Sequence, residues 1–130
     1  MPVSKMNLNQ ITVYSNNPAA SIEFYQKLGL RLIVDSAPRY VRFECPDGDS
    51  TFSIHESEDD SINLKVVLYF ECADLDAEVE RLKKLGLIFD QEPIDQNWLW
   101  REAFLRDPDG NKIILYYAGE NRKNPPWRVK

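Results

Sequence analysis

The side chain in this sequence best suited to move protons near neutral pH is its single histidine, His55. It belongs to the segment STFSIHE, in which apolar and polar residues alternate as they do in a half-buried strand. Two interpretations stay open. His55 is either a general base or ligand contact, or a histidine at a strand end beside acidic residues with no catalytic role. No serine or cysteine nucleophile arrangement accompanies it.

Arg42 and Glu44 lie two residues apart in the segment YVRFEC, so they project from the same face of a predicted strand. An arginine can bind a carboxylate or phosphate group through two parallel hydrogen bonds. The alternative is an ion pair between neighbouring strands at the rim of a cavity. The residue spacing fits both interpretations.

Three large aromatic residues, Trp98, Trp100 and Tyr116, occur in the last third of the chain. Flat rings of this kind can stack against a planar ligand. They can equally close the core between two halves of the protein or form a dimer contact. The aromatic residues therefore predict either a binding surface or a packing surface.

Repeated turns and helix ends indicate that these side chains are positioned by a duplicated unit. Asp107-Pro108-Asp109-Gly110 is a turn motif, because proline presets φ at one position and glycine supplies a positive φ at another. A shorter copy, Pro46-Asp47-Gly48, precedes STFSIHE. The tetrapeptide KLGL occurs at 27–30 and again at 84–87, each time at the end of a helical pattern. Two matches in the same order favour an internal repeat.

The predicted elements follow the order βαβββ twice. In the first half, strands are expected at 8–14, 31–35, 40–45 and 51–55, with a helix at 19–28; in the second, at 64–71, 87–90, 98–106 and 112–117, with a helix at 75–85. We expect an acidic linker at 56–60, a loop at 93–97 and an extended tail at 119–130. The predicted fold is α+β: two βαβββ modules, 7–56 and 64–118, form one domain, 1–130, and pair into a curved mixed sheet around a cavity.

The alternation of residues along each strand predicts which side chains face this cavity and which face the helix. Phe52, Ile54, Ile113 and Leu115 are assigned to the helix side, together with Val41, Phe43 and Cys45. The cavity side is assigned Gln10, Thr12, Tyr40, Arg42, Ser53, His55, Val67, Trp100, Glu102, Ile114 and Tyr116. An apolar cavity with a few polar anchors is typical of a small-molecule site.

Composition excludes several other classes of function. The net charge of -5 argues against general nucleic-acid binding, which needs a basic face. No apolar run reaches the roughly 20 residues of a membrane span, and the first ten residues contain no apolar signal region. The two cysteines, Cys45 and Cys72, lack metal-binding spacing, so we expect buried, reduced thiols in a cytoplasmic protein.

The paired βαβββ pattern, the segment SIEFYQKLGL and the segment DPDGNKI resemble the vicinal oxygen chelate superfamily over roughly residues 7–118. That superfamily includes glyoxalase I, extradiol dioxygenases, fosfomycin-resistance enzymes and bleomycin-resistance proteins. The resemblance implies a homodimer and a cavity in which several strands each supply a His, Gln or Glu to a divalent metal.

The positions that the resemblance marks for metal ligands fall on Gln10, Ser53, Val67 and Ile114, of which only Gln10 is a ligand of the expected kind. A register shift of two residues would replace Val67 by Lys65, which is no better. The resemblance therefore implies a small-molecule-binding protein whose standard metal site is degenerate, with no cofactor assigned. The alternative is a divalent-metal-dependent lyase or dioxygenase-type enzyme with a rearranged ligand set that uses Gln10 and His55, together with Glu44 or Glu102.

Overall fold

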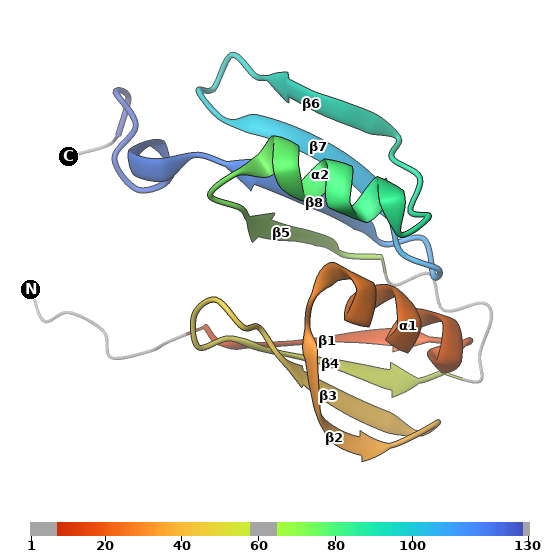
Figure 1. The fold of residues 1–130 in the computed structure, drawn as a ribbon. Helices are drawn as coiled ribbons and strands as arrows, with labels where there is room; N and C mark the ends of the chain where they lie inside the picture. The colour runs from red at the N-terminus through yellow and green to blue at the C-terminus, as the bar shows by residue number, and fades with distance from the viewer. Residues whose placement is uncertain (1–7, 58–64, 129–130) are drawn as a thin grey trace, which may run out of the picture. The chain divides into compact units, whose positions relative to one another are not determined.

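The computed structural model describes residues 8–57 and 65–128, and the chain divides into two compact units, residues 1–64 and 65–130 (Figure 1). The first unit contains β1 (Gln10–Ser15), α1 (Pro18–Leu28), β2 (Arg31–Ser36), β3 (Tyr40–Glu44) and β4 (Thr51–Glu56). The second contains β5 (Val67–Glu71), α2 (Leu75–Lys84), β6 (Gln91–Asp95), β7 (Arg101–Arg106), β8 (Lys112–Tyr117) and the short 3₁₀ helix η1 (Gly119–Arg122).

Each unit is an open four-stranded sheet with one helix against one face. The strand order is β1-β4-β3-β2 in the first sheet and β5-β8-β7-β6 in the second. In both sheets the first pair is parallel and the other pairs are antiparallel. The predicted α+β class and the repeated βαβββ order are therefore confirmed.

The helices begin and end where the sequence signals predicted. The Asn17 side chain accepts a hydrogen bond from the backbone N–H of Ala20 (3.4 Å), and Pro18 occupies the first turn of α1. Gly29 ends that helix in the left-handed conformation, with φ of 107°. Asp74 caps α2 in the same way as Asn17 caps α1.

A hydrophobic core lies between the helix and the sheet in each unit. In the first unit the Tyr25 ring of α1 packs against Phe52 of β4, with ring centroids 4.4 Å apart. In the second, Val79 and Leu82 of α2 and Ile113 of β8 are almost completely buried. The residues assigned to the helix side are buried as predicted, except that Cys45 is only half-buried.

The DPDGN segment is a structural turn held by a buried carboxylate. Asp107 Oδ1 accepts hydrogen bonds from the backbone N–H groups of Asp109 (3.0 Å) and Asn111 (2.8 Å), and Oδ2 accepts from the Asn111 side chain (2.8 Å). Asn111 Oδ1 in turn accepts from the backbone N–H of Val66 at 3.0 Å. This turn therefore positions β8 beside the chain that enters β5.

Three predictions of local structure in the second sheet are wrong. The sixth strand is β6 (Gln91–Asp95) and not 87–90, so the expected loop at 93–97 lies largely within it. Pro93 predicts the end of a strand, because proline has no N–H to donate. It is tolerated here because β6 is an edge strand whose register shifts between Gln91 and Ile94. Residues 98–100 form a turn instead of joining β7, and Leu99 takes a φ of 67°.

The tail departs from the predicted extended form. It begins with η1, because both Ala118 and Gly119 donate their backbone N–H groups to Glu71 Oε2 at 2.9 Å. The expected acidic linker falls mainly on residues 58–60, which lie outside the described residues.

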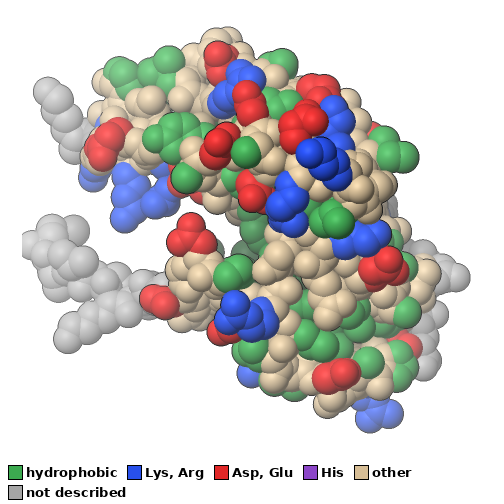
Figure 2. Space-filling model, viewed as in Figure 1, with side chains coloured by type: hydrophobic (Ala, Val, Ile, Leu, Met, Phe, Trp, Pro, Cys, Tyr) green, Lys and Arg blue, Asp and Glu red, His purple; other side chains and the backbone are tan. Residues whose placement is uncertain are grey.

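The outer surface of the second unit carries charges of both signs. Figure 2 shows Lys and Arg side chains mixed with Asp and Glu side chains over α2. Arg101 joins Asp76 of α2 to Asp95 of β6, each at 3.0 Å, which assigns that arginine to holding the helix on the sheet. Among the described helices, none is both long and apolar enough to cross a bilayer.

Candidate ligand-binding faces of the two sheets

The predicted site residues lie on the sheet face opposite the helix in each unit, as their alternation with buried core residues indicates. In the first unit these residues are Gln10, Thr12, Tyr40, Arg42, Ser53 and His55; in the second they are Val67, Trp100, Glu102, Ile114 and Tyr116. We call these surfaces the polar face and the aromatic face, respectively.

The polar face is centred on Ser53, which is completely buried. Its Oγ lies 2.6 Å from Gln10 Nε2, which donates to it, and 2.7 Å from the Tyr40 hydroxyl. Thr51 Oγ1 donates to Gln10 Oε1, so both ends of that amide are engaged. These bonds tie β1, β4 and β3 together across the face.

Arg42 completes this network without an acidic partner. Its Nε donates to the Tyr40 hydroxyl at 2.9 Å, and the guanidinium carbon lies 5.5 Å from the centre of the Tyr40 ring. Glu44 pairs with Arg31 of β2 at 3.0 Å. The predicted ion pair between neighbouring strands therefore forms through Glu44, whereas Arg42 takes part in no ion pair among the described residues.

The Tyr40 phenol has an altered acidity. The hydrogen bond from Ser53 is the main influence that lowers its pKa, and the Arg42 guanidinium adds to the effect, while partial burial opposes it. Donors and a nearby positive charge stabilise a phenolate more than a phenol. The polar face is thus an environment that favours negative charge.

His55 is exposed at the far end of the polar face. Its ring lies 5.5 Å from the Tyr14 ring and 6.2 Å from the Tyr40 ring, measured between centroids. Its Nδ1 lies 3.1 Å from the carbonyl oxygen of Glu56. Both interpretations of His55 remain compatible with this position.

The aromatic face is packed upon itself. Trp100 and Tyr116 stack with ring centroids 4.5 Å apart and planes 14° from parallel. The Tyr69 ring is nearly perpendicular to both of these rings, with centroids 6.0 Å from that of Trp100 and 5.8 Å from that of Tyr116. Trp98 lies apart from this stack, where its Nε1 donates to the buried carboxylate of Glu102 at 2.8 Å.

The four positions marked for metal ligands do not fit a divalent ion. The side chains of Val67 and Ile114 have no donor atom. Gln10 and Ser53 have donor atoms, but they are hydrogen-bonded to each other and to their neighbours. Within residues 8–57 and 65–128, no group of three or more His, Cys, Asp or Glu side chains could hold a metal ion.

The alternative pair Gln10 and His55 is also poorly placed. In the register of β1 and β4, Gln10 pairs with Thr51 and His55 pairs with Tyr14. The two candidates are therefore four residues apart along the sheet, which corresponds to roughly 13 Å at about 3.3 Å per residue. Ligands of one zinc-like ion lie within about 2.0–2.2 Å of it.

Sequence reasoning missed two residues of these faces, Thr51 and Tyr69. Thr51 lies two residues before Ser53 on the same side of β4, and Tyr69 lies two residues after Val67 on β5. Strand alternation alone could have found both, because residues two apart share a face.

Two βαβββ units of identical strand order define a paired-module architecture. A model of the Glyoxalase/Bleomycin resistance protein/Dioxygenase superfamily matches residues 7–115. The chain belongs to this superfamily, which is the family that the sequence motifs predicted. The protein is also 28% identical over 127 residues to "Uncharacterized protein YraH" of Bacillus subtilis (strain 168), and the match covers 85% of this chain and 98% of the relative.

Solved structures share the fold. A glyoxalase/bleomycin resistance protein/dioxygenase from Nocardioides superposes with a TM-score of 0.78 at 21% identity, covering 99% of this chain and 93% of that chain. A lactoylglutathione lyase from Agrobacterium tumefaciens superposes with a TM-score of 0.71 at 18% identity, covering 85% and 92%. At these identities the likeness concerns the fold alone.

Proposed function

We propose that this chain is a small-molecule-binding member of the superfamily that works without the standard divalent-metal site. The observation that carries the proposal is the chemistry at the four ligand positions. Gln10 and Ser53 are bonded into a protein network, and Val67 and Ile114 offer no ligand atom. A metal needs several N, O or S donors with open positions, and these residues do not supply them.

Two features of the sheet faces favour a ligand-binding role. The polar face offers hydroxyl, amide and guanidinium groups beside one another, and such groups can orient a ligand. The aromatic face offers rings with which a flat molecule can make contact, of which Tyr69 is 53% exposed. The metal-dependent lyase or dioxygenase-type alternative would need Gln10 and His55 to converge, and the register of β1 and β4 gives that no support.

The metal content of the purified protein tests the proposal. We expect elemental analysis, after growth and purification without chelator, to find divalent metal well below one ion per chain. Added Mn²⁺, Ni²⁺, Zn²⁺ or Fe²⁺ should not be retained after desalting. A stoichiometric ion that is lost in His55→Ala or Gln10→Ala would overturn the proposal and establish a rearranged metal site.

A binding measurement supplies the second half of the test. The protein in excess chelator should bind a flat probe such as benzamide or benzoate, and binding should not strengthen when chelator is replaced by metal. Binding only in the presence of metal would contradict the proposed function.

We further propose a cytoplasmic homodimer. Each open sheet leaves two edge strands, and the free thiols Cys45 and Cys72 suit a reducing compartment. Analytical ultracentrifugation of the untagged protein should give twice the chain mass of 15.2 kDa. A monomer at all concentrations tested would refute this assembly.

A further inference from the structure

We propose that Arg42 and Tyr40 form a site for the carboxylate group of an organic anion, held in position by Ser53 and Gln10. This inference rests on the proposed function and deepens it by naming the chemical class of the ligand. Three observations on the polar face carry it: the direction of a hydrogen-bond chain, the unused donors at its end, and the missing acidic partner of the arginine.

We assign the hydrogen-bond chain a direction from the Gln10 amide, whose oxygen faces the Thr51 hydroxyl and whose nitrogen faces Ser53. The Thr51 hydroxyl donates to Gln10 Oε1, so the other end of that amide is its N–H₂ group. Gln10 Nε2 then donates to Ser53 Oγ at 2.6 Å. Ser53 is completely buried, and a buried hydroxyl proton needs an acceptor. The Tyr40 oxygen, 2.7 Å away, is that acceptor.

At the end of the chain the Tyr40 oxygen is saturated as an acceptor. It receives one hydrogen bond from Ser53 and a second from Arg42 Nε at 2.9 Å. A phenol oxygen has two acceptor sites and one proton. With Ser53 as the donor, the proton of Tyr40 points away from both neighbours, and the hydroxyl makes no hydrogen bond to a third group among the described residues. It is available to a ligand.

Arg42 adds further donors beside this proton. Its Nε holds Tyr40, which leaves the two Nη groups without a carboxylate in the described part of the chain. The nearest acidic residue along β3, Glu44, is paired with Arg31. The polar face therefore presents only donors and one uncompensated positive charge at this point, so the matching ligand group is an acceptor with negative charge.

A carboxylate fits this arrangement better than a phosphate ester. One guanidinium and one phenol supply a planar fork and one further donor, and they balance one negative charge. A phosphate dianion would need a second cation, and Arg42 is the one permanently charged side chain among the residues named for the polar face, which also include His55. The lowered pKa of Tyr40 agrees with a surface that favours negative charge.

Titration calorimetry with benzoate, benzamide and phenyl phosphate, all in excess chelator, tests the proposal. The unmodified protein should bind benzoate more tightly than its neutral counterpart benzamide and more tightly than phenyl phosphate. Arg42→Gln should weaken benzoate binding about tenfold to hundredfold, the range expected for loss of a charged hydrogen-bond donor. It should leave benzamide binding within about twofold, because the amide carries no charge.

Matched variants separate the site from general effects on folding. Arg31→Gln removes an arginine that pairs with Glu44 on the same sheet and should leave benzoate binding unchanged. Tyr40→Phe keeps the ring but removes the ligand-facing proton, so it should weaken benzoate binding less than Arg42→Gln does. Circular dichroism checks that each variant is folded, and Arg42→Lys provides a conservative replacement that keeps the charge but loses the fork.

Each outcome has a defined meaning. Equal affinity for benzoate and benzamide, or an unchanged benzoate affinity in Arg42→Gln and Arg42→Lys, overturns the carboxylate site while the metal-free binding function stands. Tighter binding of phenyl phosphate than of benzoate overturns the carboxylate assignment and identifies the site as one for a phosphate group. Binding of none of the three probes in chelator overturns the site and the proposed function together.

Discussion

The two units share one topology but differ on the sheet face opposite the helix. In the first sheet Ser53 pairs with Thr12 of β1 and with Arg42 of β3. At the equivalent place in the second sheet Ile114 pairs with Tyr69 of β5 and with Phe104 of β7. The Ser53 hydroxyl, the Thr12 hydroxyl and the Arg42 guanidinium thus correspond to the Ile114 aliphatic chain and to the Tyr69 and Phe104 rings.

This difference separates what the fold requires from what it leaves free. The helix-facing side is alike in both units: a capped helix covers alternate apolar residues such as Phe52 and Ile113, which are almost completely buried. The opposite side can be polar or aromatic without changing strand order or register. The helix-facing sides therefore specify the fold, while the opposite sides are free to differ between the two units.

The prediction with the largest expected effect tests whether the two units unfold as one domain of residues 1–130. All three tryptophans lie in the second unit, so their fluorescence reports that unit alone. Phe43→Ala, at a fully buried position of the first unit, should lower the free energy of unfolding by about 3–5 kcal/mol. If the two units unfold together, this loss of stability will shift the urea transition that tryptophan fluorescence detects to a lower urea concentration.

Ile88→Ala provides the control, because this side chain is 85% exposed and its loss should change stability by no more than about 0.5 kcal/mol. A tryptophan transition that stays in place in Phe43→Ala, while circular dichroism detects a separate earlier transition, would show two independent units.

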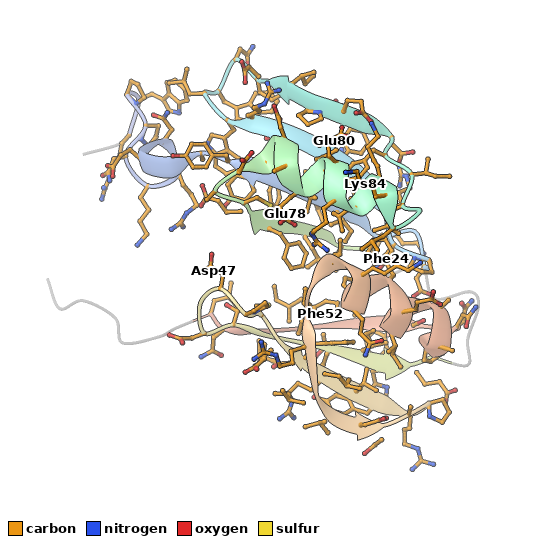
Figure 3. All side chains as sticks on the ribbon, viewed as in Figure 1. Phe24, Asp47, Phe52, Glu78, Glu80 and Lys84 are labelled. Atoms are coloured by element: carbon orange, nitrogen blue, oxygen red, sulfur yellow. The ribbon has the colours of Figure 1, made fainter. Side chains whose placement is uncertain are left out.

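The second prediction compares the two proline-containing turns. Asp107→Ala removes a buried carboxylate that accepts three hydrogen bonds, and it should cost about 1.5–3 kcal/mol. Asp47 lies exposed in the loop between β3 and β4 (Figure 3), so Asp47→Ala should have little effect. Urea unfolding measures both. Equal losses would mean that the Asp107 network contributes no more than an exposed turn residue.

Those turns also explain how much of the fold the sequence predicted. Interactions between residues close in the sequence determine the structure of the DPDGN and KLGL segments and of the helix caps Asn17 and Asp74. These features could therefore be predicted from the sequence. The wrong predictions concern segments whose structure depends on contacts with residues far away in the sequence. β6 runs through Pro93 because it pairs with β7 on one side only, and η1 forms because Glu71, far away in the chain, accepts the N–H groups of Ala118 and Gly119.

The third prediction compares one thiol from each unit. Burial, with the negative charges of Glu78 and Glu71, raises the pKa of Cys72 to about 11, and burial also raises the pKa of Cys45. Near neutral pH the thiolate fraction of Cys72 should be about a hundredfold below that of a thiol with the ordinary pKa of 9.0.

Alkylation by iodoacetamide measures this difference, with Cys45→Ser and Cys72→Ser variants so that each thiol reacts alone. Cys72 should react more slowly than Cys45, and its rate should keep rising as the pH approaches 11. A plateau in the Cys72 rate below pH 9 would contradict the assigned environment.

The candidate site was predictable in position but not in chemistry. Strand alternation placed Tyr40, Arg42 and Ser53 on one face, because the period of a strand is fixed by its backbone. It could not reveal that Glu44 binds Arg31 instead of Arg42, or that Trp100 stacks on Tyr116. Those pairings depend on side-chain conformations and on neighbouring strands, which residue spacing does not specify.

The smallest effect contrasts one tyrosine from each face. Ser53 and Arg42 lower the pKa of Tyr40, whereas burial, followed by the charge of Glu71, raises the pKa of Tyr116. Absorbance titration near 295 nm should therefore lose an early-ionising component in Tyr40→Phe and a late-ionising one in Tyr116→Phe. Ser53→Ala should move the Tyr40 component to higher pH, while the exposed-residue control Ser36→Ala should not.

The same shifts predict opposite effects on stability in alkaline solution. Between the lowered pKa of folded Tyr40 and the unfolded value of about 10, the unfolded chain holds more protons at this group, so its contribution to stability rises with pH. For Tyr116 the folded state holds its proton longer, so its contribution falls as the pH rises above about 10. Tyr40→Phe should thus make urea unfolding more sensitive to alkali, and Tyr116→Phe less sensitive. The reverse order would mean that the polar face does not favour negative charge, which would also remove support from the carboxylate site.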